Sequence, residues 1–161
     1  SVFSRVFRLD KEAGNQMDKI HAQATKLIEA PPGKVYAVLA NYNQSHPAIL
    51  PKQVFSDLVV EQGGVGAGTV VRVTMAAPGT KQELHVTVSE PEPGRILVES
   101  GSGMITTFTV DPKAGGKSSQ VTISTEATPS PGLQGWIEKL VTPGLLWDEL
   151  HLLAKYVEEK S

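Results

Sequence analysis

The C-terminal stretch from Leu133 to Glu158 carries the longest apolar pattern of the chain. Its apolar residues recur three or four positions apart, which is the spacing of one face of an α-helix. Because Pro143 lacks the N–H that a helix interior uses, we predict a kink or two abutting helices there. The apolar positions are Leu133, Trp136, Ile137, Leu140, Val141, Leu146, Trp147, Leu150, Leu153, Ala154 and Val157. A lone helix cannot keep such a face out of water, so the rest of the chain must cover it.

The preceding sequence predicts mostly short strands. Residues 19–28 form the first, and Pro31-Pro32 open a helix over 34–40, because proline fits the first helical turn. Residues 41–51 predict a loop or a short second helix that ends at its prolines. Six further segments with period-2 alternation follow, separated by turns: 54–61, 69–76, 82–90, 95–99, 104–110 and 120–127. We therefore predict an α+β fold, in which a curved antiparallel sheet of about six or seven strands wraps around the long C-terminal helix.

Composition limits the classes of partner. A length of 161 residues suits one domain, and a net charge of −2 without a basic stripe argues against nucleic acid. The lack of cysteine removes disulfides and thiolate nucleophiles and fits a cytoplasmic protein. No apolar run approaches the roughly 18 residues of a membrane span, so we expect no integral membrane association.

Residues 1–16 differ from the rest. We expect them to be a leader that was added in cloning or is disordered, with Met17 as the natural first residue and 17–161 as the single domain. The alternative is a targeting or membrane-surface segment, because Phe3, Phe7 and Arg5 could share a short basic amphipathic helix.

Three local strings and the order of the elements resemble the START-like superfamily, also called SRPBCC, and within it the polyketide cyclase/dehydrase-like group. The strings are IEAPPGKVYAVLANYNQSHPAILP, GGVGAGTVV and VSEPEPGRILVESG. The resemblance covers residues 18–158 and implies a helix-grip fold, like that of the birch-pollen allergen, with a deep cavity between sheet and C-terminal helix. Such cavities hold lipids, sterols, polyketides, plant hormones or isoprenoid quinones. One departure is His46, where many relatives carry tryptophan.

The residues offer few candidates for chemistry. Four histidines lie at no metal-ligand spacing, so we expect no metal and no cofactor. The resemblance places His46 and Tyr42 beside the cavity entrance, which makes them the catalytic candidates if the protein is an enzyme. The glycine-rich run at 63–68 precedes a strand rather than a helix, so it indicates a hairpin turn and not a phosphate loop. No GxSxG string indicates a serine nucleophile.

Strand alternation and helix periodicity predict the cavity lining, with a solid core of the same residues as the alternative. We expect the acidic pair Asp148-Glu149 on the solvated face of the helix. Arg72 is expected to point outward; pointing inward, it would anchor an anionic ligand. The predicted ligand-binding residues are Tyr42, His46, Val71, Val73, Met75, Leu84, Val86, Thr106, Phe108, Leu146, Trp147 and Leu150.

Three hypotheses for the function stay open. The first is binding of a hydrophobic small molecule, such as a lipid, polyketide or isoprenoid, in a pocket of roughly 300–1,000 Å³. The second is a cyclase or dehydratase that uses the same cavity to orient its substrate and moves a proton with His46 or Tyr42. The third is a module that binds a protein partner, whose identity the sequence does not indicate.

Overall fold

The computed structural model describes residues 19–77, 80–128 and 134–159. The predicted leader at 1–16, Met17 and the predicted helix start at Leu133 lie outside the described residues. Within the described ranges, no helix combines the length and the apolar character that crossing a bilayer requires.

Among the described residues, seven strands form one sheet in the order β1-β7-β6-β5-β4-β3-β2, and each neighbouring pair is antiparallel. The strands are β1 (Ile20–Ile28), β2 (Phe55–Gln62), β3 (Val70–Ala77), β4 (Thr80–Glu92), β5 (Ile96–Gly101), β6 (Met104–Lys113) and β7 (Ser118–Ala127). Two short helices, α2 (Pro32–Ala40) and η1 (His46–Ile49), connect β1 to β2, and the short turn η2 (Ala114–Gly116) connects β6 to β7. The predicted α+β arrangement is confirmed, with seven strands.

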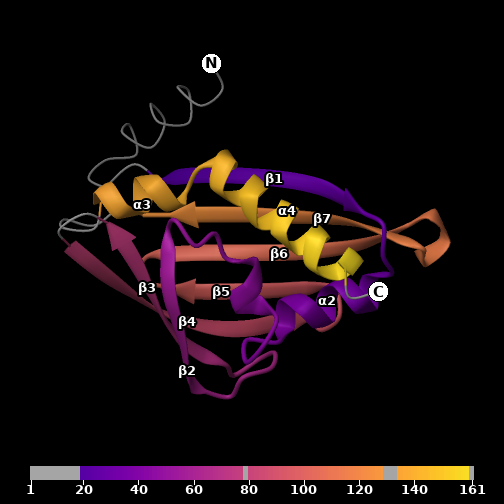
Figure 1. Cartoon of the computed structure of the whole chain (residues 1–161), viewed down its shortest axis with the longest axis horizontal. Helices are drawn as coiled ribbons and strands as arrows, with labels where there is room; N and C mark the ends of the chain where they lie inside the picture. The colour runs from indigo at the N-terminus through magenta and orange to yellow at the C-terminus, as the bar shows by residue number, and fades with distance from the viewer. Residues whose placement is uncertain (1–18, 78–79, 129–133, 160–161) are drawn as a thin grey trace.

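Local residue choices explain the shape of the sheet. Ser102 and Gly103 both have positive φ and join β5 to β6 as a two-residue hairpin turn, which suits the twist of the strands. The β4–β5 register shifts between Ser89 and Glu92, and this irregularity accommodates Pro91, which has no N–H for the ladder. Such irregularities bend strands, and Figure 1 shows the sheet curving around the C-terminal helix.

The C-terminal segment forms two abutting helices, α3 (Gln134–Leu140) and α4 (Pro143–Glu159), which is one of the two predicted outcomes. Pro143 takes the first position of α4, where its missing N–H has no helical partner to lose. The hydroxyl of Thr142 accepts a hydrogen bond of 3.3 Å from the Leu145 N–H and so caps the new helix. The proline therefore starts a helix instead of kinking one.

Helix α4 lies across the inner face of the sheet, where it contacts β1 and β7 and also the two short helices α2 and η1 (Figure 1). Its inward face consists of Leu145, Leu146, Glu149, Leu150, Leu153, Ala154 and Val157, all buried. From the sheet, Ala22, Val73, Leu97, Phe108 and Ile123 belong to the same buried core as this face. One apolar core thus occupies the space between the sheet and α4.

We expect Leu153→Ala to destabilise the protein by about 2–5 kcal/mol, because the Leu153 side chain is fully buried between α4 and the sheet. The matched control is Leu27→Ala on β1, where the leucine is 52% exposed and the same change should cost less than about 1 kcal/mol. Urea denaturation of both variants measures the difference. Equal losses would contradict the assigned inner face of α4.

Candidate functional site

A cavity of about 70 Å³ lies between the inner face of the sheet and the end of α3 and start of α4. Most of its lining is apolar: Leu50, Phe55, Leu58, Val71, Val73, Leu84, Val86, Met104, Leu140, Leu145 and Leu146. The polar lining consists of Tyr42, His46, Glu99, Thr106, Thr125 and Glu149. The cavity is smaller than the 300–1,000 Å³ expected from the sequence, because Met75, Phe108 and Leu150 fill the neighbouring space as solid core.

The glycine-rich loop between β2 and β3 holds the backbone from which Tyr42 projects. The Tyr42 N–H donates to the carbonyl of Gly64 at 2.8 Å, and the Gly66 N–H donates to the carbonyl of Ala40 at 2.9 Å. Gly64 and Gly66 have φ values of +144° and +68°, which favour glycine, and a Cβ on Gly64 would lie 2.3 Å from the Asn43 side chain. The loop is therefore a hairpin turn that fixes the position of Tyr42.

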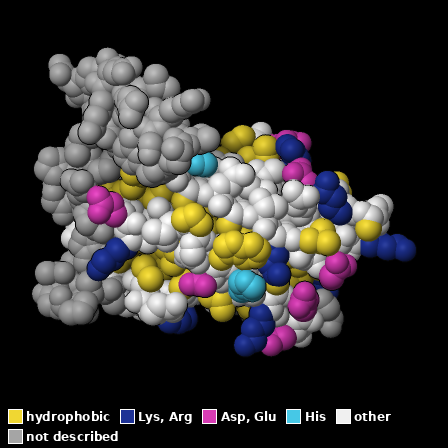
Figure 2. Space-filling view, turned by 90° about the horizontal axis from the view of Figure 1, so that it is seen from above, with side chains coloured by type: hydrophobic (Ala, Val, Ile, Leu, Met, Phe, Trp, Pro, Cys, Tyr) yellow, Lys and Arg dark blue, Asp and Glu magenta, His cyan; other side chains and the backbone are white. Residues whose placement is uncertain are grey.

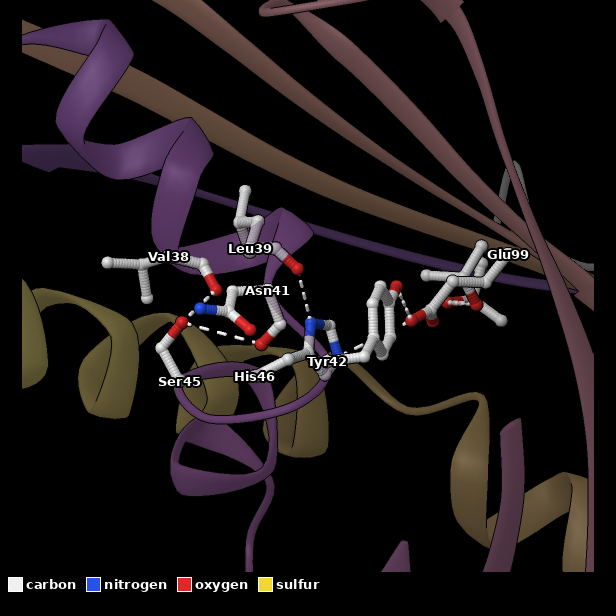
Figure 3. A network of polar contacts seen from close by, with 9 residues as sticks. Val38, Leu39, Asn41, Tyr42, Ser45, His46 and Glu99 are labelled. Atoms are coloured by element: carbon white, nitrogen blue, oxygen red, sulfur yellow. Dashed lines mark hydrogen bonds and ion pairs between the residues drawn. The ribbon is translucent and has the colours of Figure 1, made fainter. Parts of the chain in front are cut away.

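Tyr42, His46, Glu99 and Glu149 form what we call the polar cluster. The Tyr42 hydroxyl donates to Glu99 Oε2 at 2.5 Å, and His46 Nε2 lies 3.3 Å from the same oxygen (Figure 3). The Tyr42 and His46 rings stack with centroids 4.2 Å apart, and the edge of Phe108 packs against His46. Two elements far apart in sequence, the segment after α2 and strand β5, thus meet at one carboxylate.

The orientation of His46 is set by the backbone at the end of α2. Its Nδ1 lies 2.7 Å from the Leu39 carbonyl oxygen, and because a carbonyl only accepts, Nδ1 carries a proton and donates it. Nε2 is then the ring nitrogen that faces Glu99 (Figure 3). Nε2 is therefore the atom through which His46 contacts the polar cluster.

Glu149 is the second carboxyl group of the cluster, and α4 carries it into the cavity lining. It is 7% exposed and makes no hydrogen bond to the residues that the structure describes. Burial, followed by repulsion from the Glu99 carboxylate, raises the pKa of Glu149 to about 8. At neutral pH the cavity therefore contains one carboxyl group paired with Tyr42 and His46 and one uncharged carboxylic acid.

Tyr42 stays a hydrogen-bond donor. Burial, with the negative charge of Glu99 as the next cause, raises the pKa of Tyr42 well above its ordinary value.

The polar cluster provides no metal site by geometry, since within the described ranges no three histidine or acidic side chains are arranged to hold a metal ion.

The structure brings most of the predicted ligand-binding residues to the cavity, and their contact with a ligand stays a prediction. Those in the lining are Tyr42, His46, Val71, Val73, Leu84, Val86, Thr106 and Leu146. Met75, Phe108 and Leu150 are fully buried in the core beside the cavity. The expectation that Trp147 lines the cavity is wrong: it is 40% exposed, its ring lies tilted beside that of His151, and Lys26 lies over the tryptophan ring. Residue 147 is turned about 100° from Leu146 around the helix, which takes it out of the buried face.

The expectation that Glu149 lies on the solvated face of the helix is also wrong. Leu145, Leu146 and Leu153 flank it three or four positions away, so helix periodicity places it on the inner face, whereas Asp148 is exposed. Strand alternation likewise indicates that Glu99 points inward, because it lies two residues after the buried Leu97 and on the same side of the strand. Both carboxyl groups were thus detectable from periodicity.

Arg72 lies on the outer face of β3, as the alternation of the strand favours. Its guanidinium group pairs with Glu83 at 3.2 Å and with Glu61 at 3.6 Å, both on neighbouring strands. The alternative role of Arg72 as an inward anchor for an anionic ligand is therefore wrong. His85, in the cross-strand position from Arg72, is also exposed.

We expect the stability of the protein to depend on pH through Glu149. A carboxyl group whose pKa is raised by folding favours the folded state below the unfolded pKa near 4.5, and this stability is lost as pH rises toward 8. Between pH 5 and pH 8 the unfolding free energy should fall by about 3 kcal/mol more in the wild type than in Glu149→Gln. Chemical denaturation at both pH values measures this. Parallel pH profiles of the two proteins would contradict the buried, uncharged state.

Comparison with known proteins agrees with the architecture. The solution structure of KanY protein is 29% identical with a TM-score of 0.69, and the match covers 90% of this chain and 99% of that one. Norcoclaurine synthase from Thalictrum flavum, in complex with dopamine and hydroxybenzaldehyde, is 19% identical (TM-score 0.66; 91% of this chain, 90% of that one). Zhui aromatase/cyclase from Streptomyces sp. R1128 is 15% identical (TM-score 0.65; 88% and 95%).

These likenesses confirm the predicted helix-grip fold, which Ara h 8.0201 also shares at a TM-score of 0.60 and 15% identity, over 88% of this chain and 99% of that one. No curated protein matches the chain. Residues 19–158 match the family described as "Polyketide cyclase / dehydrase and lipid transport", and the chain therefore belongs to that family.

Proposed function

We propose that the protein binds a hydrophobic small molecule in the cavity and fixes the one polar group of that molecule at the polar cluster. The observation that carries this proposal is the distribution of the lining, in which apolar side chains surround a single group of hydrogen-bonding residues. Apolar burial supplies affinity in such sites, and a few placed polar groups supply orientation. Membership of a family that is described by cyclisation and lipid transport supports the same reading.

The shape of the cavity indicates how such a molecule would lie. Phe55, Leu58, Val86 and Met104 line the cavity but are only partly buried, so they mark the side on which it approaches solvent. The polar cluster includes His46 and Tyr42, which are almost fully buried and therefore lie deeper in the molecule than these residues. Since about 70 Å³ admits only a few non-hydrogen atoms, the polar end of the ligand enters the cavity and a longer apolar part extends between β2, β3 and α3.

A second candidate function is acid–base catalysis in the same cavity. The observation that favours it is the pair of carboxyl groups in unlike environments, which is a recurring arrangement of general bases and acids. Glu99 accepts a hydrogen bond from Tyr42 and lies beside His46, whereas Glu149 is an uncharged acid. The Glu149 acid would donate to a carbonyl oxygen of the substrate, and Nε2 of His46, with Glu99, would exchange a second proton. Two structural neighbours, norcoclaurine synthase and an aromatase/cyclase, are named as enzymes, so the fold accommodates catalysis.

Filling the cavity should abolish ligand binding without unfolding the protein. Val73→Phe adds an aromatic ring to the lining from β3, at a cost of about 1–3 kcal/mol in stability. Val59→Phe is the matched control, because Val59 is 36% exposed on β2. Native mass spectrometry of protein purified gently from its natural source should show an added mass, released on denaturation, in the wild type and in Val59→Phe but not in Val73→Phe. A wild type without added mass would overturn the proposal.

If the protein is an enzyme, its pH–rate profile should carry the signature of Glu149. The rate with any accepted carbonyl substrate should fall above about pH 8, where the acid loses its proton. Glu149→Gln should lower the rate by about 10²–10⁴-fold and remove this alkaline limb. His46→Ala should lower kcat more than it weakens binding. Variants that change only affinity would assign the cluster to binding alone.

A further inference from the structure

We propose that the polar group this cavity selects is an amine, so that the protein prefers hydrophobic primary amines to alcohols and carboxylates of the same size. This inference rests on the proposed function and names the ligand class of the same site. It follows from which charged groups line the cavity and from one buried carboxyl group that the fold leaves without a hydrogen bond.

The charged groups around the cavity have one predominant sign. Glu99 and Glu149 are its acidic residues, His46 is its only basic one, and no lysine or arginine of the described residues lines it. The single basic group is committed to Glu99, at 3.3 Å. Glu149 is therefore a second acidic group without a compensating positive charge in the site.

Charged groups from the surrounding elements do not change this balance. Strand β5 presents Glu99 to Glu149, and the segment that contains η1 presents Tyr42 and His46. On α4 itself, Asp148 and His151 are exposed. On β1, Lys26 has its ammonium group 5.9 Å from the centre of the Trp147 ring, on the exposed side of α4. On α3, Glu138 and Lys139 are exposed.

Glu149 also has an unmet hydrogen-bonding capacity. Its side chain is more than nine-tenths buried, lines the cavity, and has no hydrogen-bond partner among the described residues. The Tyr42 hydroxyl and Nε2 of His46 are both directed at Glu99 instead. A buried carboxyl group without partners costs free energy in the empty protein, and a ligand that donates hydrogen bonds to it recovers that cost.

An alkylammonium group fits these conditions better than other polar groups do. It brings three N–H donors and one positive charge, whereas the facing Glu99 and Glu149 oxygens accept hydrogen bonds. When it binds, Glu149 releases its proton to solvent, and the new ion pair leaves the net charge of the site unchanged. A hydroxyl group brings one donor and no charge, and a carboxylate adds a like charge in an apolar enclosure, which is strongly unfavourable.

Proton release gives the proposal a pH dependence of known sign. Because the amine requires ionised Glu149, its affinity should rise about tenfold from pH 6 to pH 7 and level off above about pH 8. The affinity of an alcohol should not rise, since it binds beside the uncharged acid. Glu149→Gln should therefore remove both the rise with pH and the preference for the amine.

The test is calorimetric titration of the full chain with hexylamine, 1-hexanol and hexanoate at pH 6, 7 and 8. We expect hexylamine to bind at least tenfold more tightly than 1-hexanol at pH 8, and hexanoate to bind most weakly. Titration at pH 7 in two buffers of different ionisation enthalpy should show release of about one proton per hexylamine bound. Asp148→Asn is the matched control, because it removes the neighbouring acid from the exposed face of the same helix.

The outcomes separate this inference from the proposed function. If 1-hexanol binds as tightly as hexylamine, or if Asp148→Asn removes the preference as Glu149→Gln does, the amine inference fails and the binding function stands. If none of the three compounds binds, the proposed function fails as well. Binding of hexylamine that is lost only in Glu149→Gln, together with the released proton, supports both.

Discussion

The packing of α4 on the inner face of the sheet is the contact on which the rest of the structure depends. An antiparallel sheet with one apolar face requires a cover, and α4 supplies it with a continuous row of buried leucines from Leu145 to Leu153. The same helix places Glu149 inside the molecule, because that residue lies in the middle of the row. The face of α4 that packs on the sheet therefore also carries the acid of the candidate site. The packing around Glu149 keeps this acid uncharged.

The polar cluster shows how a small set of contacts gives two carboxyl groups different properties. Glu99 accepts a hydrogen bond from the Tyr42 hydroxyl and lies beside His46, whereas Glu149 is buried without a hydrogen bond to the described residues. The difference originates in the backbone, since the Leu39 carbonyl orients the His46 ring and the glycine-rich loop fixes the chain at Tyr42. The different properties of the two carboxyl groups therefore follow from backbone contacts outside the cavity.

Much of the fold was predictable because it follows from periodicity. Alternation located the seven strands of the described sheet, and Pro143 marked the junction between α3 and α4. The candidate site was only partly predictable. Charge was taken as evidence of exposure for Glu149, and Trp147 was counted with the apolar face of the helix although it directly follows Leu146. The position of a residue around the helix decides whether it is buried when large apolar neighbours fix which face of the helix packs on the sheet. The pairing of Tyr42 and His46 with Glu99 was beyond the sequence, since it joins segments that meet only in the folded sheet.

The position of β1 beside β7 has a consequence for the speed of folding. The two strands pair along their whole length, yet contacting residues such as His21 and Ser124 are separated by 103 positions of sequence. Local hairpins from β2 to β7 can form first, whereas the pairing of β1 must wait until this large loop closes against its entropy. The inner face of the sheet would then stay exposed to water during the slowest step, which makes the partly folded chain the form most prone to aggregate.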